Sequence, residues 1–481
     1  MTADQRLAVA GVEGTGPAGE ASDDLTALCQ RHPGASGLAL LSSDTQAFAA
    51  RLTLARRARH RLDLMYYIWE EDLTGRLLLS EVLAAADRGV EVRLLLDDIG
   101  FTSHDRLLQA LNTHPRISVR LFNPTRAEKG STRRMVEIAL RWFSMTRRMH
   151  NKAWIADDQA AILGGRNIGD PYFGASSASN YHDLDLLALG PVVAEAAAMF
   201  QTFWTGDLTL PVREPRSETR FRPILAALRG LRHAEEAQPY LARLPVLSWP
   251  PEEARLHWCA ETRLLADPPE KALGRKGHNW LMVRLAPLFD AARECIAVSS
   301  PYFVPGTTGT RRLTALAARG VRVSILTNSL AATDVAAVHG AYARYRRPLL
   351  AGGVRLYELR AVSRIRRLSI RGRINAKLHT KAFTIDGSTG FVGSLNFDPR
   401  SASLNTEMGV LFSAPALVAE MDRLFAGETA PAVSHALRLD GRGRLLWQGS
   451  RGELLTREPG VSLRRRLLAW LIGLLPLESQ L

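Results

Sequence analysis

His150-Asn-Lys152-Ala-Trp-Ile-Ala-Asp157 is the stretch that decides how this chain is interpreted, because it returns as His379-Thr-Lys381-Ala-Phe-Thr-Ile-Asp386. Both copies follow the pattern His-x-Lys-x-x-x-x-Asp. Lysine is scarce in this sequence: six of its 62 basic residues are Lys, and two of those six occupy this pattern. A merely basic position would in most cases have been Arg here. The repeated Lys therefore predicts a specific chemical role.

The repeat extends to both sides of the motif. In each half an Arg-Gly pair ends a helical pattern and begins an apolar stretch, at Arg88-Gly-Val-Glu-Val and at Arg319-Gly-Val-Arg-Val. A pair of small residues with Asn two positions later follows each motif, in Gly164-Gly165-Arg166-Asn167 and Gly393-Ser394-Leu395-Asn396. Strands that alternate with helices predict an α/β fold of two pseudo-symmetric lobes, each with a mostly parallel mixed sheet flanked by helices.

The spacing within the motif puts His and Lys on one face of a strand, because residues i and i+2 of a strand point the same way. His150 shares a face with Lys152, and His379 shares a face with Lys381. Two lobes docked about a pseudo-twofold axis would bring these faces together. The sequence therefore predicts an active site at the lobe interface, with two imidazoles and two ammonium groups around one phosphate.

Cleavage of a phosphodiester needs this set of groups. Neutral imidazole is a nucleophile near pH 7, and a second imidazole can protonate the leaving alkoxide. The lysines and the amides of Asn167 and Asn396 can hold the nonbridging oxygens. A carboxylate is expected on the far nitrogen of each histidine, where it fixes the tautomer. The candidates are Asp183 or Asp185 in the first half and Glu407 in the second.

The other residues of the motif complete the predicted site. Asp157 and Asp386 close their strands at a turn and are grouped with His and Lys as catalytic candidates, while Gly165 and Ser394 are supporting candidates. No cofactor and no metal is expected, since the lysines supply the positive charge. The cysteines lie too far apart in the sequence to predict a zinc site or a disulfide framework: they are Cys29, Cys259 and Cys295.

Length and composition predict several domains. The chain has 481 residues, of which 46% are hydrophobic and 23% charged, an ordinary globular balance. The net charge of +14 indicates an anionic partner, either lipid head groups or nucleic acid. The repeat and the Pro-rich stretches predict a disordered leader over 1–35, a first lobe over 36–212, a linker over 213–261, a second lobe over 262–428 and a basic, apolar tail over 429–481.

Three segments are candidates for contact with lipid. In 462–476 three arginines precede an apolar run, which predicts a helix in the membrane interface or, alternatively, a buried helix that covers one lobe. The basic segment 133–148 is either a membrane-facing helix at the mouth of the active site or an ordinary surface helix. The segment 334–346 carries His339, Tyr342 and Arg346 as a head-group wall or as structural residues. No stretch reaches the roughly 18–20 apolar residues that span a bilayer.

At these residues the sequence resembles the phospholipase D superfamily, whose signature is the paired His-Lys-Asp motif, and within it the bacterial cardiolipin synthases of the C type. The likeness covers nearly the whole chain after about residue 30, and both motif copies are intact. The resembling stretches include Tyr66-Tyr-Ile-Trp69, Arg147-Arg-Met-His-Asn-Lys152, Gly164-Gly-Arg-Asn-Ile-Gly-Asp-Pro-Tyr-Phe173, Ser299-Ser-Pro-Tyr-Phe-Val-Pro305, Leu326-Thr-Asn-Ser-Leu-Ala-Ala332 and Asn396-Phe-Asp-Pro-Arg-Ser401.

The resemblance implies a phosphatidyl-histidine intermediate, with His150 as the nucleophile and His379 as the acid and then the base. It implies phosphatidylglycerol as the acceptor and phosphatidylglycerol or phosphatidylethanolamine as the donor. The expected partners are these phospholipids and a membrane surface, not nucleic acid, and the expected location is the cytoplasmic face of a bacterial inner membrane. The alternatives are a phospholipase D-type hydrolase or nuclease with the same two-histidine centre, and a noncatalytic membrane-binding protein.

Overall fold

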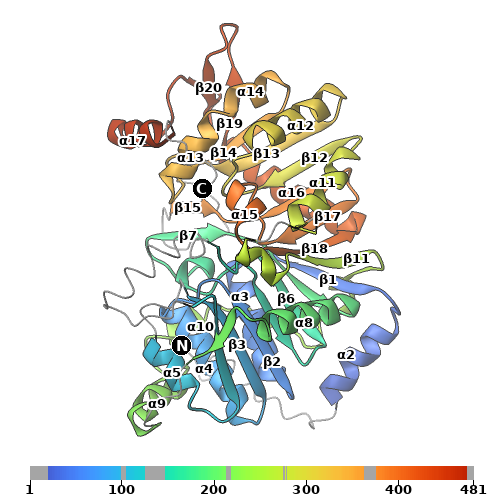
Figure 1. The fold of residues 1–481 in the computed structure, drawn as a ribbon, viewed down its shortest axis with the longest axis vertical. Helices are drawn as coiled ribbons and strands as arrows, with labels where there is room; N and C mark the ends of the chain where they lie inside the picture. Colours follow the sequence, from blue (N-terminus) through green and yellow to red (C-terminus); the bar gives the residue numbers. More distant parts are fainter. Residues whose placement is uncertain are drawn as a thin grey trace, which may run out of the picture.

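The computed structural model has two lobes stacked along its long axis, with the N-terminal lobe below the C-terminal lobe in Figure 1. It describes residues 20–98, 105–124, 147–212, 218–274, 277, 279–361 and 375–473. Each lobe contains a large mixed sheet flanked by helices. The predicted α/β fold with two related lobes is therefore confirmed.

In the first lobe one sheet has nine strands within the described residues. Their order across the sheet is β10 (His257–Cys259), β1 (Ser36–Leu41), β8 (Asp185–Leu189), β6 (Ala160–Gly164), β5 (Ala153–Ala156), β2 (Arg61–Tyr66), β3 (Glu91–Asp97), β4 (Ile117–Phe122) and β9 (Thr209–Pro211). The helices of this lobe are α2 (Glu20–Gln30), α3 (Asp44–Arg57), α4 (Leu73–Asp87), α5 (Asp105–Leu111), α8 (Pro191–Trp204), α9 (Arg222–Leu231) and α10 (Gln238–Leu241).

In the second lobe the sheet has ten strands over the part of the chain that the structure describes. Their order is β11 (Thr262–Ala266), β18 (Met408–Ser413), β17 (Thr389–Gly393), β16 (Ala382–Ile385), β12 (Cys295–Ser299), β13 (Arg322–Asn328), β14 (Arg355–Leu359), β19 (Ser434–Leu439), β20 (Leu445–Gln448) and β21 (Leu454–Leu455). The helices are α11 (Leu281–Asp290), α12 (Gly306–Ala318), α13 (Ala336–Ala343), α14 (Arg346–Ala351), α15 (Pro399–Ser403), α16 (Pro415–Thr429) and α17 (Leu463–Gly473).

The two sheets repeat one topology. β2, β3 and β4 run parallel in the first sheet, as β12, β13 and β14 do in the second. The strands that follow the motif histidines, β5 and β16, pair antiparallel with β2 and β12. The remaining pairings within the two sheets are also antiparallel, and some of them, such as that of β5 with β6, follow from short turns that can join only antiparallel strands. The prediction that the sheets are mostly parallel is therefore wrong, although they are mixed.

The Arg-Gly pairs end helices as predicted. α4 ends at Asp87 and α12 at Ala318, and Gly89 and Gly320 follow with φ angles of 99° and 91°. Glycine adopts such angles without a steric penalty, so the chain can turn there from the helix into the next strand. β3 and β13 begin directly afterwards, and most of their residues are buried.

Three predicted domain boundaries are wrong. Residues 20–30 form α2, whose Leu25 and Leu28 pack in the core of the first lobe, so this part of the leader is ordered; residues 1–19 lie outside the described residues. The linker supplies β10 to the first sheet, and the tail supplies β19, β20 and β21 to the second. Strands of two to six residues carry too little periodicity to be predicted from sequence alone.

The lobes share a hydrophobic core. One cluster of buried side chains contains Leu163 and Leu186 of the first sheet together with Val392 and Met408 of the second. A parallel two-stranded ribbon also joins the lobes, formed by β7 (Ser179–His182) and β15 (Asn375–Leu378) near the middle of Figure 1. Because burial of apolar surface is the main source of stabilisation, this shared core holds the two motif strands in a fixed relation.

The C-terminal helix α17 packs on the second lobe. Ala469 is buried beside Leu330 and Val461, and Arg465 Nη2 donates to the carbonyl oxygen of Thr333 at 2.6 Å. Leu463 and other side chains on this helix remain exposed. Among the described residues no helix has both the length and the apolar character needed to span a bilayer. The candidate segment 133–148 lies outside the described residues except for positions 147 and 148.

The segment 334–346 is structural at two of its three candidate positions. His339 and Arg346 are buried and pair with Glu458, at 3.1 Å and 2.5 Å. Arg346 Nε also lies 2.8 Å from Glu358. These side chains therefore hold α13 and α14 in place and do not form a head-group wall.

Candidate active site

His150 binds a carboxylate that belongs to the other lobe. Its Nδ1 lies 2.8 Å from Oε2 of Glu407, in the residue before β18. The hydroxyls of Ser394 and Ser401 donate to the same carboxylate at 2.5 Å and 2.7 Å. All four side chains are buried. Because Glu407 occupies Nδ1, the Nε2 of His150 is left for a substrate.

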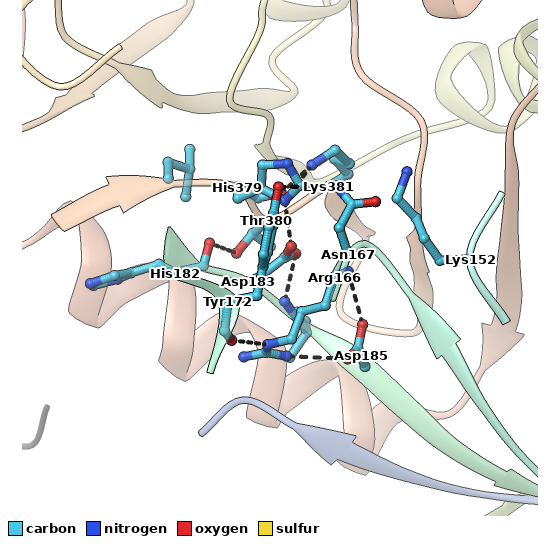
Figure 2. Close-up of polar contacts among 12 residues, drawn as sticks. Lys152, Arg166, Asn167, Tyr172, His182, Asp183, Asp185, His379, Thr380 and Lys381 are labelled. Atoms are coloured by element: carbon cyan, nitrogen blue, oxygen red, sulfur yellow. Dashed lines mark hydrogen bonds and ion pairs between the residues drawn. The ribbon is translucent and has the colours of Figure 1, made fainter. Parts of the chain in front are cut away.

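His379 has the corresponding arrangement with the first lobe. Its Nδ1 lies 2.5 Å from Oδ2 of Asp183 (Figure 2). The rings of Tyr172 and Tyr181 lie with their centroids 5.1 Å from the imidazole. A Cβ at position 165 would stand 2.7 Å from Oδ1 of Asp183, so this carboxylate requires Gly165 beside it. The supporting role predicted for Gly165 thus has a steric basis.

Each histidine therefore pairs across the lobe interface, whereas the sequence placed each carboxylate with the histidine of its own half. The correction follows from how the backbones dock. The N–H of His150 donates to the carbonyl of Thr406 at 2.9 Å, and the N–H of His379 donates to the carbonyl of His182 at 2.7 Å. Glu407 directly follows Thr406, and Asp183 directly follows His182, so each backbone contact places a carboxylate beside the histidine of the other lobe.

Asp185, the second candidate of the first half, has other partners. Its carboxylate lies 2.9 Å from Arg51 and 3.5 Å from Arg166, and all three side chains are buried (Figure 2 shows the contact with Arg166). A buried guanidinium needs such a counter-charge. Asp185 therefore neutralises this pair of arginines, and its assignment to a histidine is wrong.

The two motif lysines meet at the same centre. Lys152 Nζ donates to the carbonyl oxygen of His150 at 2.6 Å, and Lys381 Nζ donates to that of His379. Lys152 extends from the first lobe toward Lys381 in Figure 2, and burial, together with the charge of Lys381, lowers the pKa of Lys152. Positive charge at the centre thus comes from side chains. The described residues contain no group of three His, Cys, Asp or Glu that could hold a metal ion.

Burial favours the neutral form of both imidazoles, and at His379 the carboxylate of Asp183 opposes this effect. Burial lowers the pKa of His150 well below 6.5, and the charges of Lys152 and Lys381 lower it further. Burial and Lys381 also lower the pKa of His379, against the raising effect of Asp183. A neutral imidazole is the form that can attack phosphorus.

The other charged groups of the centre are shifted in different directions. Burial lowers the pKa of Lys381 to about 8 and raises the pKa of Glu407 to about 7. Burial would also raise the pKa of Asp183, but the adjacent charges of His379 and Lys381 bring it below 3.8. Asp183 is therefore ionised at pH 7, whereas Glu407 exchanges a proton near that pH.

Asn167 and Asn396 occupy equivalent positions beside the centre. Asn167 donates to the hydroxyl of Tyr172 at 3.0 Å and accepts from the N–H of Ile68 at 3.3 Å. The Oδ1 atom of Asn396 is buried and has no hydrogen-bond partner among the described residues. A buried polar atom without a partner costs roughly 1–3 kcal/mol, so this oxygen is available to accept a hydrogen bond from a donor group of a substrate, such as a hydroxyl.

Comparison with known families agrees with this geometry. The family model described as "Cardiolipin synthase, PLD-like domain" matches residues 52–204 and 285–428, one motif copy in each segment. The chain belongs to this family. The predicted recognition, and with it the prediction of an enzyme of the phosphatidyltransferase type, is confirmed.

Individual relatives in this family cover most of the chain. It is 42% identical over 471 residues to cardiolipin synthase C of Escherichia coli (strain K12), across 94% of this chain and 97% of that protein. It is 26% identical to cardiolipin synthase A of Salmonella arizonae, across 89% and 77%. The solved phosphatidylserine synthase of Haemophilus influenzae Rd KW20 has a TM-score of 0.59 at 15% identity, across 92% and 96%, which shows a shared fold.

The Asp of each motif copy lies at the far end of its strand. Asp157 accepts hydrogen bonds from the N–H groups of His60 and Arg61 at 2.7 Å and 2.8 Å, and Asp386 accepts from those of Glu294 and others at 2.8–2.9 Å. Four residues of a strand lie between each Asp and its motif Lys, and five steps of extended chain span roughly 16 Å. The catalytic assignment of Asp157 and Asp386 is therefore wrong; they fix the turns that end β5 and β16.

Replacement of Asp386 by Ala should weaken folding and spare catalysis. We expect the free energy of unfolding to fall by about 1–3 kcal/mol at pH 7, because three backbone N–H groups lose their acceptor. The backbone bonds hold the pKa of Asp386 below 3.8 although burial opposes them, so this stability is present above pH 3.8 and is lost as the pH falls. Urea unfolding measures the loss. A large fall in turnover of the still-folded variant would contradict the structural role.

Sequence reasoning missed two residues that hold the motif segments. Asp97, at the end of β3, accepts from the N–H of Met149 at 2.9 Å and pairs with Arg148 at 3.3 Å. Asn328, at the end of β13, accepts from the N–H of Leu378 at 2.9 Å. Each thus holds the residue before a motif histidine. The available signal was a polar residue at the end of each apolar strand after the Arg-Gly pair.

Proposed function

We propose that this chain is a cardiolipin synthase that transfers a phosphatidyl group from a donor phospholipid to phosphatidylglycerol. The donor is phosphatidylglycerol or phosphatidylethanolamine. The observation that carries the proposal is the crossed pairing of two motif histidines with Glu407 and Asp183, beside two motif lysines. The 42% identity to a protein named cardiolipin synthase C supports this choice of substrates within the family.

In the first step Nε2 of His150 attacks the phosphorus atom of the donor. The bond between phosphorus and the head-group oxygen breaks, and His379 gives its proton to that oxygen, so that a free alcohol leaves. The phosphatidyl group remains on His150. Lys152 and Lys381 offset the negative charge that develops on the nonbridging oxygens.

In the second step a glycerol hydroxyl of phosphatidylglycerol attacks the same phosphorus atom. His379, now neutral, accepts the proton of this hydroxyl, and the bond between phosphorus and His150 breaks. The product carries four acyl chains, and both histidines return to their starting forms. His379 thus gives a proton in the first step and takes one back in the second, so it acts first as the acid and then as the base.

The two carboxylates support this assignment of roles. An ionised carboxylate favours the imidazolium form of its partner, and Asp183 keeps a pKa below 3.8 beside His379. Glu407 has a pKa of about 7 because of burial, so it stabilises an imidazolium at His150 less. His379 is then the better acid and His150 the better neutral nucleophile.

The enzyme acts at a membrane surface in this proposal, at the cytoplasmic face of a bacterial inner membrane. Its net charge of +14 favours anionic lipid. The exposed Leu463 and Leu467, 77% and 54% accessible, stand next to the arginines of α17 and suit the interface of a bilayer.

Product analysis with isotopically distinct lipids tests the proposal. Purified protein is incubated with dispersed phosphatidylglycerol, with and without phosphatidylethanolamine, and products are identified by mass spectrometry. A tetra-acyl product that carries one phosphatidyl group from the donor is the expected result. Phosphatidic acid as the main product would instead support a phospholipase D-type hydrolase with the same centre.

We expect the buried charge of Lys381 to lower the free energy of unfolding although turnover requires it. Its pKa of about 8 lies below the ordinary 10.5 because of burial, so the cost of burying its charge is fully present below pH 8 and declines as the pH rises toward 10.5. Lys381→Met should therefore raise the free energy of unfolding at pH 7 by about 1–3 kcal/mol and abolish turnover. Urea unfolding and product assays test both effects, and equal or lower stability would contradict the assigned cost.

The same pKa predicts a pH profile for the parent enzyme. Because Lys381 loses its charge as the pH rises through about 8, kcat/KM should fall above this value. Lys377→Met, in the neighbouring strand β15, provides a matched control that should keep the profile of the parent enzyme.

A further inference from the structure

A large cavity lies between the lobes behind the second motif strand. It has a volume of about 650 Å³, within the range of small-molecule sites. The first lobe contributes residues 42–44 and 182–184 to its lining, and the second lobe contributes parts of β12, β16 and α16. Val433, just before β19, completes the lining.

The cavity is separate from the place where the phosphate reacts. Thr380, Ala382, Phe383 and Thr384 of the motif segment line it. His379 and Lys381 are not among the lining residues, and they are offset by an odd number of positions from Thr380, Ala382 and Thr384, whose side chains alternate with theirs along the strand. Asp183 belongs to the wall between the cavity and His379. Neither step of the phosphatidyl transfer takes place in this space.

The internal repeat shows that the cavity is specific to the second lobe. Strand registers align Met65 with Ser299, because they face Ala153 and Ala382 of the two motif strands, and align Ile155 with Thr384. Met65 and Ile155 are buried in a packed core under α8. Their smaller counterparts Ser299 and Thr384 line the cavity under α16. The sequence of the second lobe thus leaves open a volume that the first lobe fills.

The lining has an apolar part and an acceptor-rich part. Met421, Leu424 and Phe425 of α16 form an apolar wall. The acceptor-rich part of the lining contains the carboxylates of Asp44 and Glu428. Asp44 lies 3.3 Å from the buried Arg166, and Glu428 lies 3.6 Å from His182. The hydroxyls of Ser42, Ser43 and Thr380 are also in the lining.

These groups select the head of a ligand. Carboxylates repel a carboxylate or phosphate head and accept hydrogen bonds from hydroxyl groups. Arg423 of α16 also lines the cavity, but it is exposed, whereas Asp44 is buried and Glu428 is half-buried, so the carboxylates belong to the inner part of the lining. A hydrocarbon chain suits the wall of α16.

We propose that this cavity binds an uncharged, hydroxyl-bearing lipid with a single hydrocarbon chain, of the monoacylglycerol class. The chain lies against Met421, Leu424 and Phe425, and the hydroxyl groups face Asp44 and Glu428. The site is distinct from the centre that holds the phosphate, and it does not depend on which phospholipid is the donor.

Calorimetric titration of the full-length protein tests this site. The probes are 1-monooctanoylglycerol and 1-monodecanoylglycerol, each below its critical micelle concentration. Saturable binding of one molecule per chain is expected, with affinity rising about fourfold for each added methylene group. Absence of binding, or affinity that does not depend on chain length, would overturn the proposal. Decanoate is the charged comparison, and equally tight binding of this anion would overturn the assignment of the head group.

The repeat supplies the variant that fills the cavity. Ser299→Met/Thr384→Ile introduces the side chains that the first lobe has at the same positions. This variant should lose at least about tenfold in affinity for 1-monodecanoylglycerol and keep its phospholipid turnover. Thr202→Ile, which adds an apolar group on the exposed side of α8, should bind as the parent does. Unchanged binding in the filled variant would overturn the proposal.

A second measurement covers the case in which the filled variant does not fold. The parent protein is labelled with a monoacylglycerol that carries a photoreactive diazirine in its chain, and the labelled peptides are mapped by mass spectrometry. Label on the peptide that contains Met421 to Phe425 is expected. Label confined to α17 or to other surface segments would contradict the site.

Discussion

His150→Ala should lower phosphatidyl transfer by about 10⁴-fold or more, whatever the leaving group of the donor, because the variant has no nucleophile. His379→Ala should cause a similar loss with phosphatidylglycerol as donor. It should, however, release p-nitrophenol from phosphatidyl-p-nitrophenol in a burst, since this leaving group needs no proton. Steady-state product assays and rapid-mixing absorbance measure the two effects.

The leaving-group comparison separates the roles of the two histidines. His182→Ala, in the segment beside His379 but outside the reacting centre, provides a matched control and should keep most of the turnover. A burst in His150→Ala and none in His379→Ala would reverse the assignment. Near-parent activity in either motif variant would contradict a mechanism with two histidines.

The crossed carboxylates lead to the second large effect. Asp183→Asn should lower turnover of phosphatidylglycerol by about 10³–10⁴-fold, because the amide fails to stabilise the imidazolium of His379. The same variant should lose far less in the burst phase with phosphatidyl-p-nitrophenol, because the departure of p-nitrophenol in the first step needs no acid. Glu407→Gln should instead slow both substrates, since Glu407 orients His150. Burst kinetics with the two substrates measure the difference.

Asp185→Asn tests whether the pairing crosses the interface. Asp185 neutralises Arg51 and Arg166, so its replacement should reduce stability without a dependence on the leaving group. If Asp183→Asn slowed both substrates and Glu407→Gln slowed only phosphatidylglycerol, each carboxylate would serve the histidine of its own lobe, and the crossed arrangement would be contradicted.

The sequence predicted the two lobes and the reacting groups because these depend on local pattern. The His-x-Lys spacing defines one face of a strand, and the Arg-Gly pairs end helices through the conformational freedom of Gly89 and Gly320. Both features can be found without knowing how the lobes dock. The intact second copy around His379 made the prediction of a shared centre specific.

The pairing of carboxylates with histidines could not be predicted in the same way. It depends on which backbone segment lies beside each motif after docking, and residues 182 and 406 are remote from their partners in sequence. The role of Asp157 was misassigned for a related reason. A motif shows which residues recur together but not which of them reach the substrate, and the length of β5 puts Asp157 at the far end of the strand.

The two halves of the site are chemically unequal despite the repeat. Gly165 and Ser394 stand at equivalent positions, but Gly165 makes room for Asp183 while Ser394 donates to Glu407. An extra hydrogen bond to one carboxylate and a close steric fit around the other give the two histidines different surroundings. We propose that this asymmetry lets one imidazole act as nucleophile and the other as acid.

The most direct measurement is to locate the covalent intermediate. The enzyme is mixed with phosphatidyl-p-nitrophenol, denatured rapidly at alkaline pH to preserve the nitrogen–phosphorus bond, and digested for mass spectrometry. A phosphatidyl adduct on His150 that is absent in His150→Ala is the predicted result. An adduct on His379, or product formation with no adduct on either histidine, would contradict a centre in which His150 attacks phosphorus.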